Sequence, residues 1–550
     1  MRDANSSTAS PQLRWAAYTL FIFTALGTIT GRVFSVRSAT GESAALSAND
    51  RSRWATIRSL VDHGTYSIDT ALQERVLTPD KKRRARPWRT IDMVKHRGSD
   101  GKEHFYSSKP TLLPTLLAGE YWLLKQCIGS DIFKQPFYFM RAILLISNVL
   151  PFGLYLFLLA RYVERNGTSD WGRLLVVATA AFGTFLTTYA VTLNNHLPAA
   201  ISVLIALACA IPVWRDHARD WYLFIIAGLA SGFVVANELP GLSFFCAISV
   251  ALLWKAPWRT CVAYAPAALV VLAGIFSTNY LAHQSLRPPY MHRGDGPQLA
   301  CVPPAGLELD TLQSTPQRIS PTLREAIVSA GLPLSQEATL ARSPEPQRLV
   351  LFDPTSEQRY AVLVSDQLDI CAWDQWYEYE WTDEHSGRTY VSYWTEGETQ
   401  GVDRGERSQL AYAMNVTIGH HGILSLTPIW LLSIVGVAIY LRDRELQMRE
   451  FAALVILLTI VVLAFYIARP LQDRNYGGMT SGLRWMFWLI PMWLICLVPA
   501  ADLLCQWRAG KIIAIGLLAC SIASAAYSAM NPWVHPWIYE YWAHIRWITP

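Results

Sequence analysis

The sequence predicts a mostly α-helical, polytopic membrane protein with an extracytoplasmic α+β insertion. Hydrophobic residues make up 52% of its 550 residues and charged residues only 16%, whereas soluble domains carry about 25% charged residues. Apolar runs long enough to cross a bilayer recur along the chain. Basic residues gather in the short connectors between these runs. Together these three features exclude an ordinary soluble protein.

Eleven apolar segments are long enough to be membrane spans. They cover residues 15–34, 137–160, 174–193, 196–214, 221–236, 239–254, 261–281, 423–441, 451–468, 485–504 and 511–530. The first is about 20 residues long, which exceeds the 7–15 apolar residues of a signal peptide, so we expect an uncleaved anchor. A weaker candidate, residues 111–129, contains Pro114, Glu120 and Lys125.

The topology depends on whether residues 111–129 span the membrane. If they form an interfacial amphipathic helix instead, the basic residues of the later connectors share the cytoplasmic side with Arg2 and Arg14. These residues are Arg161, Arg165, Arg173, Arg215, Arg219, Lys255, Arg259, Arg442, Arg444 and Arg449. The positive-inside bias favours this arrangement. We therefore expect about eleven spans, with the N-terminus in the cytoplasm and the C-terminus outside.

This topology divides the chain into six parts. They are an N-terminal tail with the first span (1–34), a first extracytoplasmic loop with interfacial helices (35–136), a transmembrane helix bundle (137–282), an extracytoplasmic domain (283–421), C-terminal spans (422–530) and an aromatic extracytoplasmic tail (531–550). We expect a multi-pass protein of the cytoplasmic (inner) membrane. Because the cytoplasmic connectors are short, its chemistry should face outward.

The extracytoplasmic domain contains two alternating runs, RLVLFDPTSEQRYAVLVSD and WYEYEWTDEHSGRTYVSYW. Each is typical of two strands around a turn, so we expect β-hairpins. Cys301 and Cys371 are its only cysteines, and on an oxidising face they can form a disulfide.

Charge and cysteine spacing exclude other function classes. The net charge of +5 is small for this length and gives no reason to expect a nucleic-acid partner. The nine cysteines show no C-x-x-C spacing and hence no zinc or redox motif. No D-x-D pattern follows the first span, so no metal and no cofactor is expected.

The first extracytoplasmic loop contains two candidates for chemistry. Asp50 opens a helix-like run, SANDRSRWATIRSLVDHGTYSID, and can be a helix cap, a salt-bridge partner of nearby arginines or a catalytic acid. Lys109 precedes Pro110 at the start of the interfacial helix. A lysine there can bind a lipid-linked phosphate at headgroup depth, or it can simply snorkel to the interface.

Residues 472–485, QDRNYGGMTSGLRW, form a further candidate at the outer start of a late span. The adjacent glycines permit a close backbone approach, and an arginine fork suits phosphate oxygens. Arg484 or Arg474 is thus a phosphate-binding candidate, with Asn475 and Tyr476 as possible substrate contacts. A tight turn with an interfacial arginine anchor explains the same residues.

Polar residues also stand at other outer helix ends. Asn195, His196, Glu238 and His420 lie close to the membrane boundary, where ionisable residues are candidates for function. Capping in a wet interface is the alternative. His421 follows His420 directly, and neighbouring residues on a helix point in different directions, which argues against a chelating pair.

About 80 residues of the first loop resemble the GT-C glycosyltransferases, in particular the lipid A aminoarabinose transferases and the protein O-mannosyltransferases. The resemblance rests on an acid after the first span, an Arg-aromatic-Ala step, a Gly-x-aromatic turn, and a Lys-Pro pair before an apolar helix. The matching residues are Asp50, Arg53-Trp54-Ala55, Gly64-Thr65-Tyr66, Lys109-Pro110 and Tyr121-Trp122. Arg51 and Ser108 stand where family members often have acids.

The resemblance implies a GT-C-like fold and an inverting transfer of sugar from a polyprenyl-phosphate donor, with membrane lipids around the protein. Asp50 would be the base, and Lys109 and Arg484 would hold the phosphate. Arg53 and Tyr106, which lie within the matching segment, become substrate-binding candidates. The acceptor is a lipid, a glycan or a protein. Two alternatives remain: a transporter or flippase for lipid-linked saccharides, and a non-catalytic scaffold with an extracytoplasmic binding domain.

Overall fold

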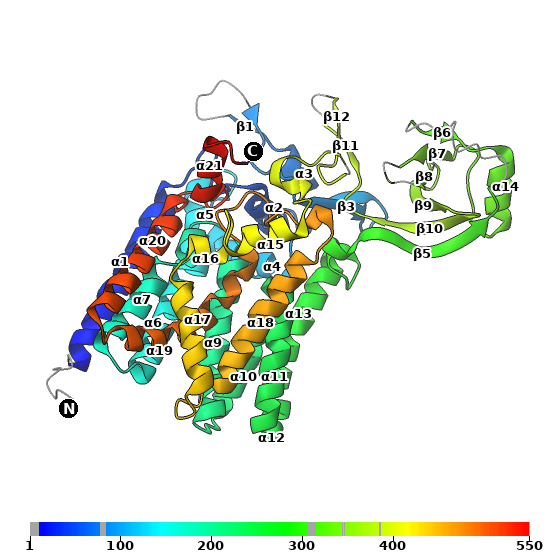
Figure 1. Ribbon diagram of the computed structural model, residues 1–550. Helices are drawn as coiled ribbons and strands as arrows, with labels where there is room; N and C mark the ends of the chain where they lie inside the picture. Colours follow the sequence, from blue (N-terminus) through cyan, green and yellow to red (C-terminus); the bar gives the residue numbers. More distant parts are fainter. Residues whose placement is uncertain are drawn as a thin grey trace. The chain divides into compact units, whose positions relative to one another are not determined.

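The structure is a computed structural model that describes residues 10–77, 84–304, 315–343, 345, 347–383, 387–395 and 397–548 (Figure 1). The first loop contains a basic run, TPDKKRRARPWR (78–89), and its start, residues 78–83, lies outside the described residues. The chain forms two compact units. The helical unit comprises Met1–Asp92, Lys109–Gln284 and Gln400–Pro550, and the sheet unit comprises Met93–Ser108 and Ser285–Thr399.

Eight helical segments of the described chain are long and apolar enough to cross a membrane. They are Pro11–Ser35 (α1), Pro136–Asn166 (α5, Pro136–Leu144; η1, Leu145–Val149; α6, Leu150–Asn166), Asp170–Tyr189 (α7, Asp170–Phe182; α8, Phe185–Tyr189), His196–Arg215 (α9), Pro257–His283 (α12, Pro257–Arg259; η3, Thr260–Tyr264; α13, Ala265–His283), Arg449–Ile467 (α18), Arg484–Leu504 (η8, Arg484–Leu489; α19, Ile490–Leu504) and Arg508–Tyr527 (α20).

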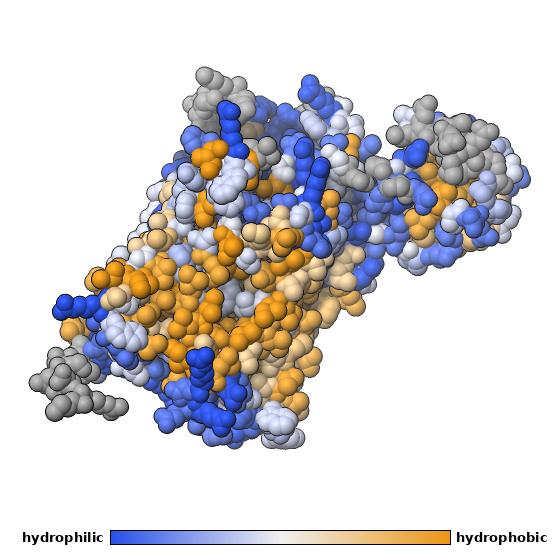
Figure 2. All heavy atoms as spheres, viewed as in Figure 1, coloured by the Kyte–Doolittle hydropathy of each residue, from blue (hydrophilic) through white to orange (hydrophobic). Residues whose placement is uncertain are grey.

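Three further apolar helices are shorter. They are Trp221–Asn237 (α10), Leu239–Lys255 (η2, Leu239–Gly241; α11, Leu242–Lys255) and Trp430–Arg442 (α17). Each of the eleven predicted segments therefore contains a helix, while the count of eleven spans stays a prediction. Figure 2 shows a broad band of apolar side chains over these helices, as expected of an integral membrane protein.

Short helices in the connections between the apolar segments contribute the candidate site and its surroundings. They are α2 (Ala48–Asp62), α3 (Asp69–Gln73), α4 (Leu112–Ile128), α15 (Gln409–Thr417), α16 (Ile423–Leu426) and α21 (Trp537–His544). Helix α4 contains most of the weaker candidate 111–129, and it leaves Leu116, Trp122 and Leu123 exposed. An apolar exposed face suits the interfacial position that we predict for it.

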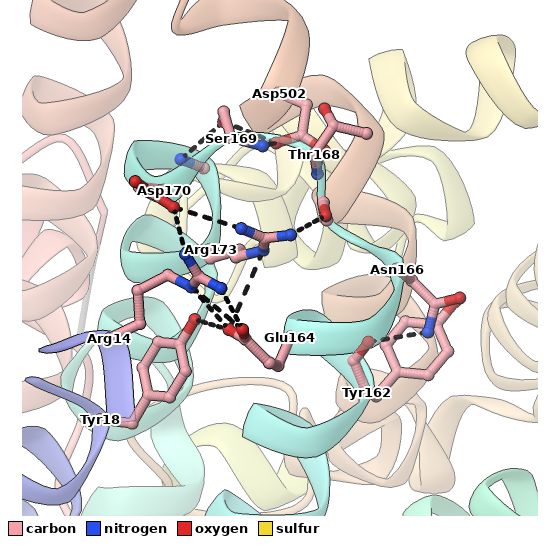
Figure 3. A network of polar contacts seen from close by, with 12 residues as sticks. Arg14, Tyr18, Tyr162, Glu164, Asn166, Thr168, Ser169, Asp170, Arg173 and Asp502 are labelled. Carbon is pink, nitrogen blue, oxygen red and sulfur yellow. Dashed lines mark hydrogen bonds and ion pairs between the residues drawn. The ribbon is translucent and has the colours of Figure 1, made fainter. Parts of the chain in front are cut away.

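A polar network ties α1 to the ends of α6, α7 and α19 (Figure 3). Arg14 of α1 donates to the Glu164 carboxylate, with Nη2 2.5 Å from Oε1, and forms an ion pair of 3.1 Å with Asp170. The Asp502 carboxylate of α19 accepts from the backbone N–H and hydroxyl of Ser169, at 2.9 and 2.6 Å. Since Ser169 itself caps α7, Asp502 anchors that helix end to α19.

The sheet unit is built on a six-stranded antiparallel sheet in the order β5-β10-β9-β8-β7-β6. Helix α14 (Pro321–Ser329) buries Leu323 and Ile327 in the same apolar core as Leu340, Leu351 and Ile370 of the sheet. The strands are β5 (Arg293–Val302), β6 (Gln317–Arg318), β7 (Thr339–Arg342), β8 (Arg348–Asp353), β9 (Gln358–Val364) and β10 (Leu368–Gln375).

The hairpins expected between residues 283 and 421 are present. Strands β8 and β9 pair around the Asp-Pro turn, and β11 (Glu380–Thr382) pairs with β12 (Thr389–Val391). Part of the second turn lies outside the described residues. The sheet unit also takes in a hairpin of the first loop, β3 (Met93–Arg97) with β4 (Glu103–Ser107). The structure describes Cys301 and Cys371 as free thiols, so it contains no disulfide between them.

Candidate functional site

Asp50 lies in the first turn of α2, where it forms a capping box with Ser47. Its Oδ1 accepts from the backbone N–H of Ser47 at 2.8 Å and from the Ser47 hydroxyl at 3.3 Å. Its Oδ2 accepts from the backbone N–H of Leu46 at 2.8 Å and from the hydroxyl of Thr192 at 2.7 Å. Both oxygens are therefore engaged in hydrogen bonds within the protein.

The burial of Asp50 is complete, at 0% exposed. Desolvation raises the pKa of its carboxyl, while the hydrogen bond from Thr192 opposes the rise. The neighbouring arginines bind elsewhere: Arg51 Nε donates to the Ser47 carbonyl at 2.8 Å, and Arg58 pairs with Asp62 at 3.2 Å. Of the three roles considered for Asp50, the cap is the one that its hydrogen bonds describe.

Arg53, one turn further along α2, reaches residues at the ends of two apolar helices. Its Nη2 donates to Asn195 Oδ1 at 2.6 Å, and Asn195 Nδ2 donates in turn to Glu238 Oε1 at 2.7 Å. Asn195 precedes α9, and Glu238 joins α10 to η2. Burial lowers the pKa of Arg53 to about 10, which leaves its guanidinium charged at neutral pH.

His196 connects this chain of contacts to Arg484. Its Nδ1 contacts Glu238 Oε1, and its Nε2 lies 2.8 Å from Arg484 Nη1. Two further N–H groups of Arg484, on Nε and Nη2, donate to the Gly477 carbonyl at 3.1 and 2.8 Å. Gly477 has a φ of +91°, and a Cβ on it would lie 2.9 Å from Arg484 Nε. The glycine thus permits the close approach that its sequence position predicts.

Lys109 pairs with an acid that the sequence analysis did not single out. Its ammonium lies 2.9 Å from Asp92 Oδ2, and both side chains are largely buried. Burial, together with the charges of Arg53 and Arg484, lowers the pKa of Lys109 to about 8, against the opposing effect of Asp92. The same charge interactions put Lys109 close to both arginines.

Thr192 and Trp533 complete the link between Asp50 and Arg484. The Thr192 hydroxyl that donates to Asp50 accepts from Trp533 Nε1 at 3.4 Å. The Arg484 guanidinium lies over the Trp533 ring, 5.2 Å from its centroid, a geometry that favours a cation. We call the set the outer polar cluster. Its members are Asp50, Arg53, Asp92, Lys109, Thr192, Asn195, His196, Glu238, Arg484 and Trp533.

The outer polar cluster brings together seven of the twelve candidates that the sequence analysis names. Three cations, Arg53, Lys109 and Arg484, lie among three carboxyl groups. Burial raises the pKa of one of these carboxyls, that of Glu238, to about 8. An array of this kind can bind an anion and exchange a proton. Within the described residues no group of three or more His, Cys, Asp or Glu side chains has an arrangement that could hold a metal ion.

Four other candidates have different partners. Tyr476 stacks on His421 at 4.4 Å, and His420 lies 5.1 Å from the Tyr476 ring. Asn475 Oδ1 accepts from the backbone N–H of Gly477 at 3.1 Å, as in a turn. Arg474 Nη1 donates to the Arg407 carbonyl at 3.1 Å. These residues form a second, aromatic group in the helical unit.

Tyr106 belongs to the sheet unit, where its ring stacks on His96 at 4.2 Å. His96 stacks in turn on Trp376, and Trp376 on His292, at 4.0 and 3.5 Å. Tyr106 thus has a packing role within its own unit.

No protein-family model and no curated protein matches the chain. Solved structures similar to it include the Saccharomyces cerevisiae protein O-mannosyltransferase Pmt1–Pmt2 complex bound to the sugar donor, with 10% identity, a TM-score of 0.42 and coverage of 97% of this chain and 92% of that chain. Another is the Archaeoglobus fulgidus oligosaccharyltransferase AglB in complex with an inhibitory peptide and a dolichol-phosphate, with 13% identity, a TM-score of 0.39 and coverage of 96% and 58%.

The chain therefore spans a little more than half the length of the archaeal enzyme. Likenesses at TM-scores below 0.5 do not establish the fold or the chemistry of this chain. Both similar structures are GT-C glycosyltransferases, the class that the first extracytoplasmic loop resembles.

Proposed function

We propose that this chain is an integral membrane glycosyltransferase of GT-C type. It transfers a sugar, with inversion, from a polyprenyl-phosphate donor to an acceptor on the extracytoplasmic face. The observation that carries the proposal is the outer polar cluster, in which Arg53 and Arg484 are buried and Lys109 is largely buried close to them. Charges in such a place are costly and typically belong to a functional site.

The cations fit the leaving group of the reaction. Transfer from a polyprenyl phosphate develops negative charge on the phosphate, and fixed cations stabilise that charge best in a water-poor site. A guanidinium has five N–H donors. Three of those of Arg484 are given to His196 and Gly477 among the described residues, which leaves two for phosphate oxygens. Lys109 supplies a second positive charge.

Asp50 is the proposed base, as the family resemblance implies. A base must accept the proton of the acceptor hydroxyl, but Thr192 occupies a lone pair of Asp50 Oδ2 in this structure. Catalysis by Asp50 therefore requires the Thr192 hydroxyl to turn away or to pass the proton on. Asp92 is the rival base, since it lies in the same cluster and its Oδ2 pairs with Lys109 at 2.9 Å.

The second, aromatic group of candidates is proposed to contact the acceptor or the sugar. Tyr476 and His420 present aromatic faces of the kind that pack against sugar rings, and Asn475 and Arg474 flank them. Membrane lipids surround the apolar helices. The lipid, glycan or protein nature of the acceptor is left open by this proposal.

The test uses the purified protein in proteoliposomes supplied with radiolabelled polyprenyl-phosphate sugars and an extract of candidate acceptors. Label recovered in an acceptor supports the proposal. Label that crosses the bilayer while still attached to its lipid indicates a flippase, and label that does neither indicates a scaffold. The apolar spans contain few charges away from their ends, which favours transfer over transport.

A further inference from the structure

We infer that Glu238 and His196 form a relay that positions Arg484, and that neither residue itself contacts the substrate. The identity of the anion that Arg484 binds rests on the proposed function. The hydrogen bonds of the relay, in contrast, are a property of the free protein.

The chemistry of the three side chains assigns the protons of the relay. A guanidinium can only donate hydrogen bonds, so Nε2 of His196, 2.8 Å from Arg484 Nη1, must be the acceptor. The imidazole proton therefore resides on Nδ1, where it is donated to Glu238 Oε1. His196 is neutral in this arrangement, since a second proton on Nε2 would face the Arg484 cation. Asn195 donates to the same carboxyl oxygen at 2.7 Å.

Engaged polar atoms separate the relay from the substrate. Both ring nitrogens of His196 are used, Nδ1 by Glu238 and Nε2 by Arg484, and Glu238 Oε1 is held by His196 and Asn195, so these atoms are not offered to a bound donor. Arg484 is held on three sides, by His196, by the Gly477 carbonyl and by the Trp533 ring. Such support fixes the direction of its two remaining N–H groups. A site preorganised in this way binds its anion without first ordering the side chain.

Two pairs of variants separate a positioning role from the alternatives. In His196→Gln the side-chain amide oxygen can replace Nε2 and still accept from Arg484. In His196→Asn the shorter amide can replace only the Nδ1–H that faces Glu238. Likewise Glu238→Gln retains an oxygen that accepts from His196, whereas Glu238→Ala does not. Ser231→Ala is the matched control, because it removes a buried hydroxyl of α10, the helix that Glu238 follows, and this hydroxyl contacts Tyr264 of η3.

The first readout is solid-state NMR of the protein in lipid, labelled with 15N at histidine. The signals of His196 are those that disappear in both His196 variants. The relay predicts a protonated Nδ1 and an unprotonated Nε2 for His196, with loss of this preference in Glu238→Ala. An Nε2–H tautomer in the parent protein would overturn the inference, whatever the protein transfers.

The second readout is binding of decaprenyl phosphate. We expect His196→Asn and Glu238→Ala to bind it about tenfold more weakly, since a charge-assisted hydrogen bond to Arg484 is lost or loosened. His196→Gln, Glu238→Gln and Ser231→Ala should stay within about threefold of the parent. Equal losses in His196→Gln and His196→Asn, or in Glu238→Gln and Glu238→Ala, would contradict positioning and indicate direct contact or proton exchange.

The two readouts keep the inference apart from the proposed function. If the parent protein shows the Nδ1–H tautomer but binds no lipid phosphate, the relay stands and the assigned donor is wrong. If it binds lipid phosphate without this tautomer, the donor assignment stands and the relay is wrong.

Discussion

The ammonium of Lys109 lies 2.9 Å from the carboxylate of Asp92, and these two residues mark where the chain leaves and re-enters the helical unit. The chain between them forms the β3–β4 hairpin of the sheet unit. The ion pair thus links the two residues between which the chain forms the β3–β4 hairpin. It also puts a lysine with a lowered pKa beside two arginines.

The pKa of Lys109 predicts the alkaline limit of donor use. Because its pKa is about 8, its ammonium loses the proton as the pH rises through 8, rather than near the usual 10.4. We expect kcat/KM for the lipid-phosphate donor to fall above pH 8, since this parameter reports the free enzyme. Lys109→Arg should extend the plateau to about pH 10, because an arginine holds its proton more tightly than a lysine and the pKa of the neighbouring Arg53 is about 10. A parent profile that stays flat to pH 10 would contradict the role of Lys109.

The variants Asp50→Asn and Asp92→Asn test which of the two carboxylates is the catalytic base. If Asp50 is the base, its replacement lowers kcat by about 10²-fold or more, and it also costs about 1–3 kcal/mol of stability because the amide cannot accept both backbone N–H groups. Asp92→Asn should mainly change KM for the donor through Lys109. Activity is measured per folded protein, well below the melting temperature. Loss of kcat in Asp92→Asn alone would assign the base to Asp92.

Thr192→Val provides the control for this comparison. It removes the hydroxyl that donates to Asp50 Oδ2 and leaves the backbone cap in place. We expect it to retain the fold of α2. A rise in kcat would indicate that Thr192 competes with the acceptor for Asp50, whereas a large fall would indicate that the hydroxyl passes the proton.

Local sequence patterns were sufficient for the helices and the hairpins. Long apolar runs and alternating strands are visible within one segment, and each predicted span contains a helix. The candidate cations were also accessible from the sequence, because Lys109 and Arg484 stand at helix ends near the expected membrane surface and Arg53 belongs to the segment that resembles the GT-C enzymes. Their residue types and topological positions together pointed to one outward-facing site.

Contacts between distant segments were not accessible in this way. Asp92 is an isolated acid in a TIDMV segment, and it meets Lys109 only because the chain returns after the β3–β4 hairpin. Thr192 and Trp533 have no local signal, although they connect Asp50 to Arg484. The capping box on Asp50 was foreseen as one reading, but its fourth hydrogen bond comes from Thr192, 142 residues away.

Glu164→Gln tests the network at the far end of the bundle (Figure 3). Glu164 accepts from Arg14 and from the Tyr18 hydroxyl, the latter at 2.9 Å. The side chains of Arg14 and Glu164 are only 10% and 19% exposed. Loss of its charge should cost about 1–3 kcal/mol of stability. Arg165→Ala is the control, since Arg165 is 61% exposed in its pair with Asp216, and exposed pairs contribute at most about 1 kcal/mol. Equal melting temperatures for the two variants would contradict a structural role for the network.

Gly477→Ala and Gly478→Ala isolate the close approach of Arg484 to the backbone. Both glycines have positive φ, +91° and +79°, so each substitution introduces backbone strain of about 1–2 kcal/mol. A Cβ at Gly477 would lie 2.9 Å from Arg484 Nε, whereas a Cβ at Gly478 would meet only Asp403 Oδ1, at 3.5 Å. Gly478→Ala therefore controls for strain alone.

We expect Gly477→Ala to displace the guanidinium from the Gly477 carbonyl and to weaken decaprenyl phosphate binding about tenfold, while Gly478→Ala changes stability only. The two variants should melt at similar temperatures, so the comparison of their phosphate affinities is direct. Equal affinities in these variants would mean that the position of Arg484 does not govern anion binding. In that case Lys109 and Arg53 would be the cations to examine next, because both lie in the same cluster.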